Sequence, residues 1–237
     1  MLLGTSLVLA AMTAQVNQPA PMPKPSVRSQ LVQPKVYELL DRAINSYQGG
    51  NYNEALACVD LVSLGKPIRV SIDFSGVSPS QKPMMESAIQ DAFQGWEDAT
   101  YGQVGFEFVQ GSGDIRIKFE KSVRQFGREV AGFAVWSRQV YDWGNQQYTN
   151  RLSGTITLRT EAPQGQNLTR EMVMHTAGHE MGHILGLWDS PRVGDIMGPL
   201  NPANPVTAPT ANEASALMSA RSEAVYIAQT AQALAKK

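Results

Sequence analysis

All three histidines of this 237-residue chain lie between residues 173 and 199, and their spacing constrains the fold more than any other feature. His179 and His183 frame the pattern His-Glu-x-x-His. On a helix, residues four apart lie on one face, so both imidazoles can reach one metal ion. Glu180, between them, can then take a proton from a water on that ion. The pattern also arises by chance on solvated helices. The residues that follow must decide between a metal site and a chance pair of histidines.

Helix geometry limits the choice of a third ligand. His175 and His183 would lie about 12 Å apart along a helix axis, too far for one ion with bonds of about 2.0–2.1 Å. His175 is therefore expected to pack behind the ligands. The third ligand should be a carboxylate, unless the group is unusual or missing. Gly186 can end the helix in a left-handed turn, which would bring Asp189 back towards the metal.

Composition and charge exclude several classes of function. The chain is 43% hydrophobic and 17% charged, as expected for a globular protein, and its formal net charge is −1. Binding to nucleic acid or to an anionic membrane surface would need a basic face, so neither is expected. Cys58 is the single cysteine, which excludes an intrachain disulfide and a cysteine-based zinc site.

The N-terminal segment indicates export and is followed by a linker. Residues 1–14 contain an apolar run too short to span a bilayer, and we interpret them as a signal peptide, the alternative being a disordered apolar terminus. Residues 15–34 carry five prolines and indicate an extended linker. The protein is thus expected to be secreted, periplasmic or in the cell envelope, with no membrane span in the mature chain.

Residues 35–64 show helical spacing of apolar side chains on both sides of a Gly-Gly-Asn turn. This predicts a small helical hairpin, similar to a single tetratricopeptide unit, that packs on the following domain or acts as a pro-segment. A lone repeat cannot bury its own face, so a repeat array is not expected. Cys58 lies among apolar neighbours and is expected to be a buried structural thiol.

Residues 66–237 are expected to form one domain of the α+β class. Their pattern predicts a mixed, partly antiparallel sheet of five strands with an active-site helix and a C-terminal helix. The strands are expected at 68–74, 104–109, 114–119, 129–136 and 154–158, and the helices at 78–100, 168–185 and from 210 onward. Residues 137–153 are expected to be a polar loop, and Thr210-x-x-Glu213 fits a capping box.

The run from His179 to Asp189 reads H-E-x-x-H-x-x-G-x-x-D, and Asp195-Ile196-Met197 follows it. This resembles the metzincin zinc proteases, and most of all their matrixin branch. The third ligand is normally histidine in that branch, whereas aspartate occurs there in some secreted bacterial metzincins such as the snapalysin group. The order of strands and helices from residue 66 to residue 230 is similar as well.

The resemblance implies a single catalytic Zn²⁺ held by His179, His183 and Asp189, with Glu180 as the general base of peptide-bond hydrolysis and Gly186 as the helix-ending turn. Met197 would be the Met-turn residue, an apolar floor under the metal. A peptide or protein substrate would lie extended along the strand at 129–136. Its implied contacts are Ala131, Gly132, Phe133, Ala134, Thr176, Pro199 and Leu200.

Several alternatives stay open beside this hypothesis of a secreted zinc endopeptidase. The chain could be an inactive metzincin-fold binding protein that uses the helical hairpin as its interaction surface, or a metal-dependent hydrolase of a non-peptide amide. In a gluzincin arrangement, a later glutamate such as Glu213 would be the third ligand. Residues 137–153 hold no histidine and few carboxylates, so calcium is unsupported and a second zinc is not expected there. We expect a monomer.

Overall fold

The structure is a computed structural model that describes residues 28–162 and 168–235. The proposed signal peptide and residues 15–27 of the proposed linker lie outside the described residues. The elements in chain order are α1 (Pro34–Gln48), α2 (Tyr52–Ser63), β1 (Ile68–Asp73), a short 3-10 turn η1 (Phe74–Gly76), α3 (Lys82–Ala99), β2 (Phe106–Phe108), β3 (Ile115–Glu120), β4 (Val123–Gln125), β5 (Arg128–Val130), β6 (Gly132–Asp142), β7 (Tyr148–Arg159), α4 (Arg170–Leu185) and α5 (Ala211–Ala235).

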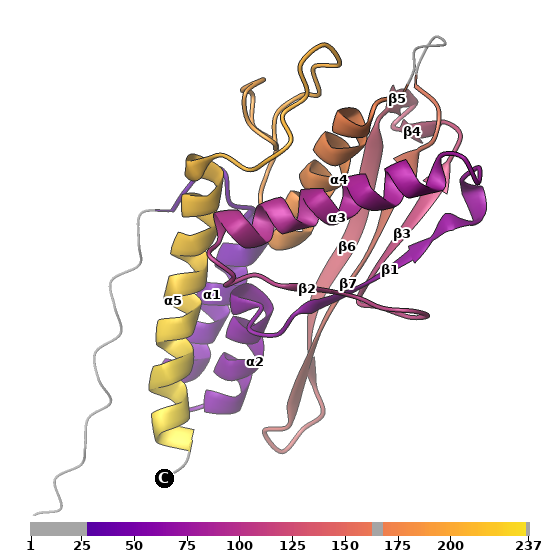
Figure 1. The fold of residues 1–237 in the computed structure, drawn as a ribbon. Coiled ribbons are helices and arrows are strands. Elements are labelled where there is room, and N and C mark those ends of the chain that lie inside the picture. Colours follow the sequence, from indigo (N-terminus) through magenta and orange to yellow (C-terminus); the bar gives the residue numbers. More distant parts are fainter. Residues whose placement is uncertain (1–27, 163–167, 236–237) are drawn as a thin grey trace, which may run out of the picture.

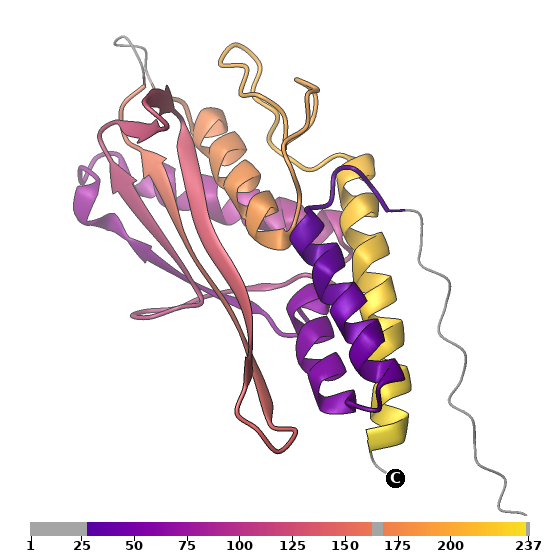
Figure 2. The same ribbon diagram turned by 180° about the vertical axis from the view of Figure 1, so that it is seen from behind.

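A mixed five-stranded sheet in the order β2-β1-β3-β7-β6 forms the centre of the molecule, as the sequence predicts. Four of its strands run parallel, and β6 is an antiparallel edge strand paired to β7 from Gly132↔Leu158 onward. Helices α3 and α4 cross one face of this sheet, whereas α1, α2 and α5 stand side by side next to it (Figures 1 and 2). The architecture is therefore the expected α+β fold.

Apolar periodicity explains where the helices lie. The predicted inner face of α3 is fully buried, with Met85 and Trp96 both 0% exposed. The apolar faces of α1 and α2 join the same hydrophobic core as the sheet and α4. Cys58 on α2 is buried and free, as predicted. No helix among the described residues is long and apolar enough to cross a membrane.

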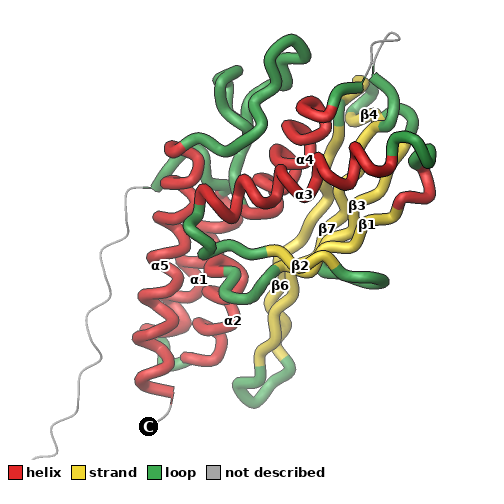
Figure 3. The backbone as a smooth tube through the Cα atoms, in the orientation of Figure 1, coloured by secondary structure: helices red, strands yellow, loops and turns green. Residues whose placement is uncertain are grey.

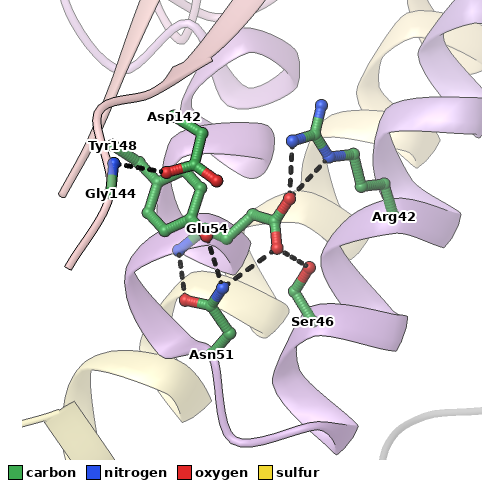
Figure 4. Close-up of polar contacts among 7 residues, drawn as sticks. All are labelled: Arg42, Ser46, Asn51, Glu54, Asp142, Gly144 and Tyr148. Atoms are coloured by element: carbon green, nitrogen blue, oxygen red, sulfur yellow. Dashed lines mark hydrogen bonds and ion pairs between the residues drawn. The ribbon is translucent and has the colours of Figure 1, made fainter. Parts of the chain in front are cut away.

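The structure corrects the prediction of a polar loop at residues 137–153. Strands β6 and β7 continue to Asp142 and from Tyr148, so most of this stretch is a long β-hairpin. Its tip turns through Gly144 and Asn145, which both have positive φ. The hairpin is polar because polar groups of the helical pair receive it: Asn51 Nδ2 donates to the Tyr148 hydroxyl at 2.7 Å (Figure 4).

The strand predicted at 129–136 is also divided in two. Strand β5 belongs to a small separate hairpin with β4, and β6 begins only at Gly132. The chain bends at Ala131 between them, and β6 then starts close to α4 and β7. A methyl group on Gly132 would lie 2.7 Å from Thr176 Cγ2 and 2.9 Å from the Thr157 carbonyl oxygen.

Candidate metal centre

Helix α4 carries two of the predicted ligands, and its ends are built by specific residues. The Thr169 side chain accepts a hydrogen bond from Met172 N at the start. At the end, Gly186 adopts φ 112°, and the amide of Leu187 reaches back to Gly182 O at 2.9 Å. This is the left-handed helix ending that glycine permits. It turns the chain sharply just after His183, as the sequence predicts.

The turn brings Asp189 to the two imidazoles. Asp189 Oδ1 lies 3.2 Å from His179 Nε2 and 3.3 Å from His183 Nε2. The ligand atoms of all three residues lie within 4.8 Å of one another. A tetrahedral ion with bonds of about 2.0–2.1 Å separates its ligands by about 3.3 Å, so the two distances to Asp189 Oδ1 match the spacing of a zinc site. Asp189 itself is largely exposed, and hydrogen bonds from His179 and then His183 hold the pKa of its carboxyl well below its usual range.

Main-chain carbonyls orient both imidazoles. Nδ1 of His179 lies 3.0 Å from Ile196 O, and Nδ1 of His183 lies 3.0 Å from Leu187 O. A carbonyl can only accept, so each Nδ1 carries a proton, which leaves each Nε2 as the atom that would bind a metal.

His175 does not join the ligand cluster. Its side chain is 2% exposed, and its Nδ1 lies 3.0 Å from Val206 O. Burial lowers the pKa of this imidazole, which favours its neutral form. His175 therefore packs behind the site and ties α4 to the loop that leads to α5.

Glu180 lies on the same helix and faces the β6 side of the cleft. It is 5% exposed, and the main chain of Ala134 is among the groups that act on its carboxyl. Burial raises the pKa of Glu180 against the opposing influence of the two histidines. A carboxylate with a raised pKa is a stronger base than one in water, which suits it to proton transfer.

Met197 packs directly against α4 at Gly182, next to His183 in the chain. A methyl group built on Gly182 would lie 2.2 Å from Met197 Sδ and 3.0 Å from Trp96 Cζ2. The indole Nε1 of Trp96 donates to Gly178 O at 2.9 Å. Met197 is 0% exposed, and it sits where the resemblance places the Met-turn.

Glu213 fills a structural role that removes it as a candidate ligand. It is 0% exposed and accepts hydrogen bonds from Thr210 N at 2.8 Å and Thr210 Oγ1 at 2.7 Å, which confirms the capping box. It also accepts from Met197 N at 2.7 Å and Ile196 N at 3.3 Å. With its oxygens thus occupied, Glu213 is outside the ligand cluster, and the gluzincin alternative is wrong.

A cleft of about 850 Å³ is lined by the three predicted ligands and by Glu180. All seven residues that the resemblance implied as substrate contacts line it: Ala131, Gly132, Phe133, Ala134, Thr176, Pro199 and Leu200. Beside the cleft is a mainly apolar cavity of about 190 Å³, bounded by Leu158, Met172 and Val173 among others. The location of these residues fits substrate binding, and the role itself stays a prediction.

Two residues beside the centre carry no sequence signal that would have revealed them. Gln33 donates from Nε2 to Leu187 O at 2.8 Å and to His183 O at 3.2 Å. Arg138 on β6 donates from Nη2 to Ile184 O at 2.7 Å. Burial lowers the pKa of Arg138 to about 10, so it is a cation at neutral pH and suits the negative end of α4.

Comparison with known proteins agrees with this geometry. The sequence profile of the matrixin family matches residues 69–212, which is more than half of the chain and spans the whole of the centre. A search of curated proteins finds no match.

Proposed function

Since this chain belongs to the matrixin family, which comprises zinc-dependent endopeptidases, we propose that it is a secreted zinc endopeptidase. The observation that carries the proposal is the convergence of two Nε2 atoms and one carboxylate oxygen. His179, His183 and Asp189 would hold one Zn²⁺. Three protein ligands and one open position are typical of catalytic zinc, whereas structural zinc has four protein ligands.

The chain's own residues supply the proton transfers. When bound, zinc polarises the scissile carbonyl and makes water acidic enough to lose a proton near neutral pH. Glu180 accepts that proton on its carboxylate and later delivers it to the nitrogen of the leaving amine. Burial, which raises the pKa of Glu180 in the metal-free protein, suits both steps, because a strongly acidic carboxyl would hold the proton too weakly to deliver it.

Strand β6 supports an extended peptide as the substrate. It is one of the two edge strands of the sheet, and Gly132, Phe133 and Ala134 line the cleft. A free strand edge binds an extended chain through main-chain hydrogen bonds. The neighbouring apolar cavity, next to Thr176 and Leu200, would take the side chain just past the scissile bond.

The central test compares Glu180→Ala with Glu171→Ala, a change at an exposed position on the same helix. Both variants should bind one zinc per chain, since neither residue is a ligand. Hydrolysis of casein or a quenched peptide should fall by roughly 10²–10⁴-fold in Glu180→Ala alone, the usual contribution of a general base. Wild-type protein without stoichiometric zinc would refute the metal site, and a fully active Glu180→Ala would refute the role of the base.

Secretion rests on the family and on the apolar residues 1–14, which lie outside the described residues. Fractionation of producing cells tests it. The enzyme should be found outside the cytoplasm and should lack these residues, whereas cytoplasmic full-length enzyme would contradict export.

A further inference from the structure

A short segment outside the family match runs beside the loop that carries Asp189. Val32 forms an isolated antiparallel bridge with Leu187. Gln33 N donates to Gly186 O at 2.8 Å, and Trp188 N donates to Leu31 O at 2.7 Å. We call residues 31–33 the strap. It supplies a strand-like partner for the main chain that joins His183 to Asp189.

The Gln33 side chain adds two contacts at the end of α4. It is 3% exposed, and its amide nitrogen lies between the carbonyl oxygens of His183 and Leu187. Both neighbours only accept, so the side-chain amide must point its NH₂ group at them. Leu187 O is also the carbonyl that orients the His183 imidazole. Gln33 therefore holds the Leu187 carbonyl, which in turn orients the imidazole of His183.

The side chain of Asp189 is largely exposed, so little packing holds it in place. The main chain on either side of it is held by hydrogen bonds. On one side, Trp188 N is held by Leu31 O. On the other side, Ser190 N donates to Met197 O at 2.7 Å. The ligand thus lies between two main-chain hydrogen bonds, and the strap provides one of them.

The strap is anchored in the fold. Val32 is 4% exposed and Val36, in the first turn of α1, is 3% exposed, and both belong to the main hydrophobic core. Pro34 begins α1 immediately after Gln33. The strap contributes no side chain to the ligand cluster, so it orders the site without occupying a ligand position.

We propose that Gln33 is a positioning residue for the metal centre, and that the strap is a permanent part of the active enzyme. This rests on the proposed function, since it assigns the strap to a zinc site. It assigns residues 31–33 to the mature protein. It therefore excludes an activating cleavage after residue 34 or further along the chain that would release the strap as part of a pro-segment.

The test replaces Gln33 with methionine, which has a similar length but no donor, and compares it with Gln30→Met at an exposed position. Zinc affinity is measured by competition with a chelator, and kcat and KM are measured at saturating zinc. Gln33→Met should weaken zinc binding by about 10-fold, the usual effect of losing a partner behind a ligand. It should lower kcat with little change in KM and shift the visible absorption of the Co²⁺-substituted enzyme.

Hydrogen exchange of the metal-free proteins separates this inference from the proposed function. The amides of residues 187–189 should exchange faster in Gln33→Met than in Gln30→Met, whether or not zinc binds. If wild type binds no zinc, the proposed function fails. The exchange data still test whether Gln33 orders residues 187–189. Equal zinc affinity, kcat and exchange in the two variants would overturn the inference. So would N-terminal sequencing of the active enzyme that finds a fully active form beginning after Gln33.

Discussion

Replacing Glu213 with alanine should destabilise the fold and loosen the metal site together. The carboxylate is completely buried and accepts from three main-chain amides, those of Ile196, Met197 and Thr210, as well as from the Thr210 hydroxyl. It thus fastens the Met-turn to the first turn of α5. Alanine would leave these donors without a partner in a space that the carboxylate had filled.

The magnitude follows from the number of buried donors. Each buried donor left unpaired costs about 1–3 kcal/mol, and removal of the charged group itself recovers part of its desolvation cost. Water that enters the vacated space would satisfy some of the amides. We therefore expect Glu213→Ala to lower the free energy of unfolding by about 3–5 kcal/mol. Glu213→Gln, which keeps the shape and one acceptor, should lose less, about 1–3 kcal/mol.

Urea unfolding of the metal-free proteins measures these losses, with Glu107→Ala on the exposed edge strand β2 as the control. Zinc affinity then tests transmission to the site, because Ile196 O orients His179 and Ile196 N is held by Glu213. Affinity should fall by about 10-fold or more in Glu213→Ala. The reasoning is refuted if Glu213→Ala unfolds within about 1 kcal/mol of the control. Unchanged zinc affinity in a destabilised variant would refute the link to His179.

Two further outcomes follow from packing and burial. Gly182→Ala should lower the free energy of unfolding by about 1–2 kcal/mol, because its methyl would overlap Met197 Sδ at 2.2 Å and the gain in helix propensity offsets only about 1 kcal/mol. A second change, Met197→Ala, should reduce the cost of the added methyl, with the contact to Trp96 Cζ2 at 3.0 Å remaining, and an additive double variant would contradict the contact with Met197. Burial raises the pKa of Cys58 to about 11, so a thiol reagent at pH 8 should label it only after unfolding. Since the folded thiol holds its proton more tightly than the unfolded one, its stabilising effect is complete below pH 9.0 and is lost as the pH rises towards 11. The free energy of unfolding, measured from pH 8 to 11, should therefore fall more steeply with pH for wild type than for Cys58→Ala.

The part of the site that could be predicted from sequence is the part built by local geometry. His179 and His183 share a face because they are four residues apart on a helix, and Gly186 returns the chain because it can adopt a positive φ. Asp189 follows from these two facts. Thr210 and Glu213 were likewise predicted as a cap, since a capping box lies within one turn.

The rest depends on contacts between distant segments, which leave no periodic pattern. Gln33 has the appearance of any linker glutamine until α1 brings it against the end of α4. The second role of Glu213, at the Met-turn, exists only once α5 has packed. The sequence predicts a loop at residues 137–153 because the stretch is largely polar, and some of its polar groups are received by polar partners such as Asn51 (Figure 4). The Gly144–Asn145 pair is a turn signal that could have indicated the hairpin.

The packing of α5 has a consequence for the timing of synthesis. This helix lies against α2 and α1, and these elements come from opposite ends of the described chain (Figure 3). A growing polypeptide cannot form these contacts until its last segment has emerged, because domains acquire their long-range contacts as folding units. Until then the amides of Ile196 and Met197 lack Glu213 as their acceptor. We therefore expect a nascent chain that has His179 and His183 but still lacks α5 to hold the residues around Met197 less firmly than the complete fold does.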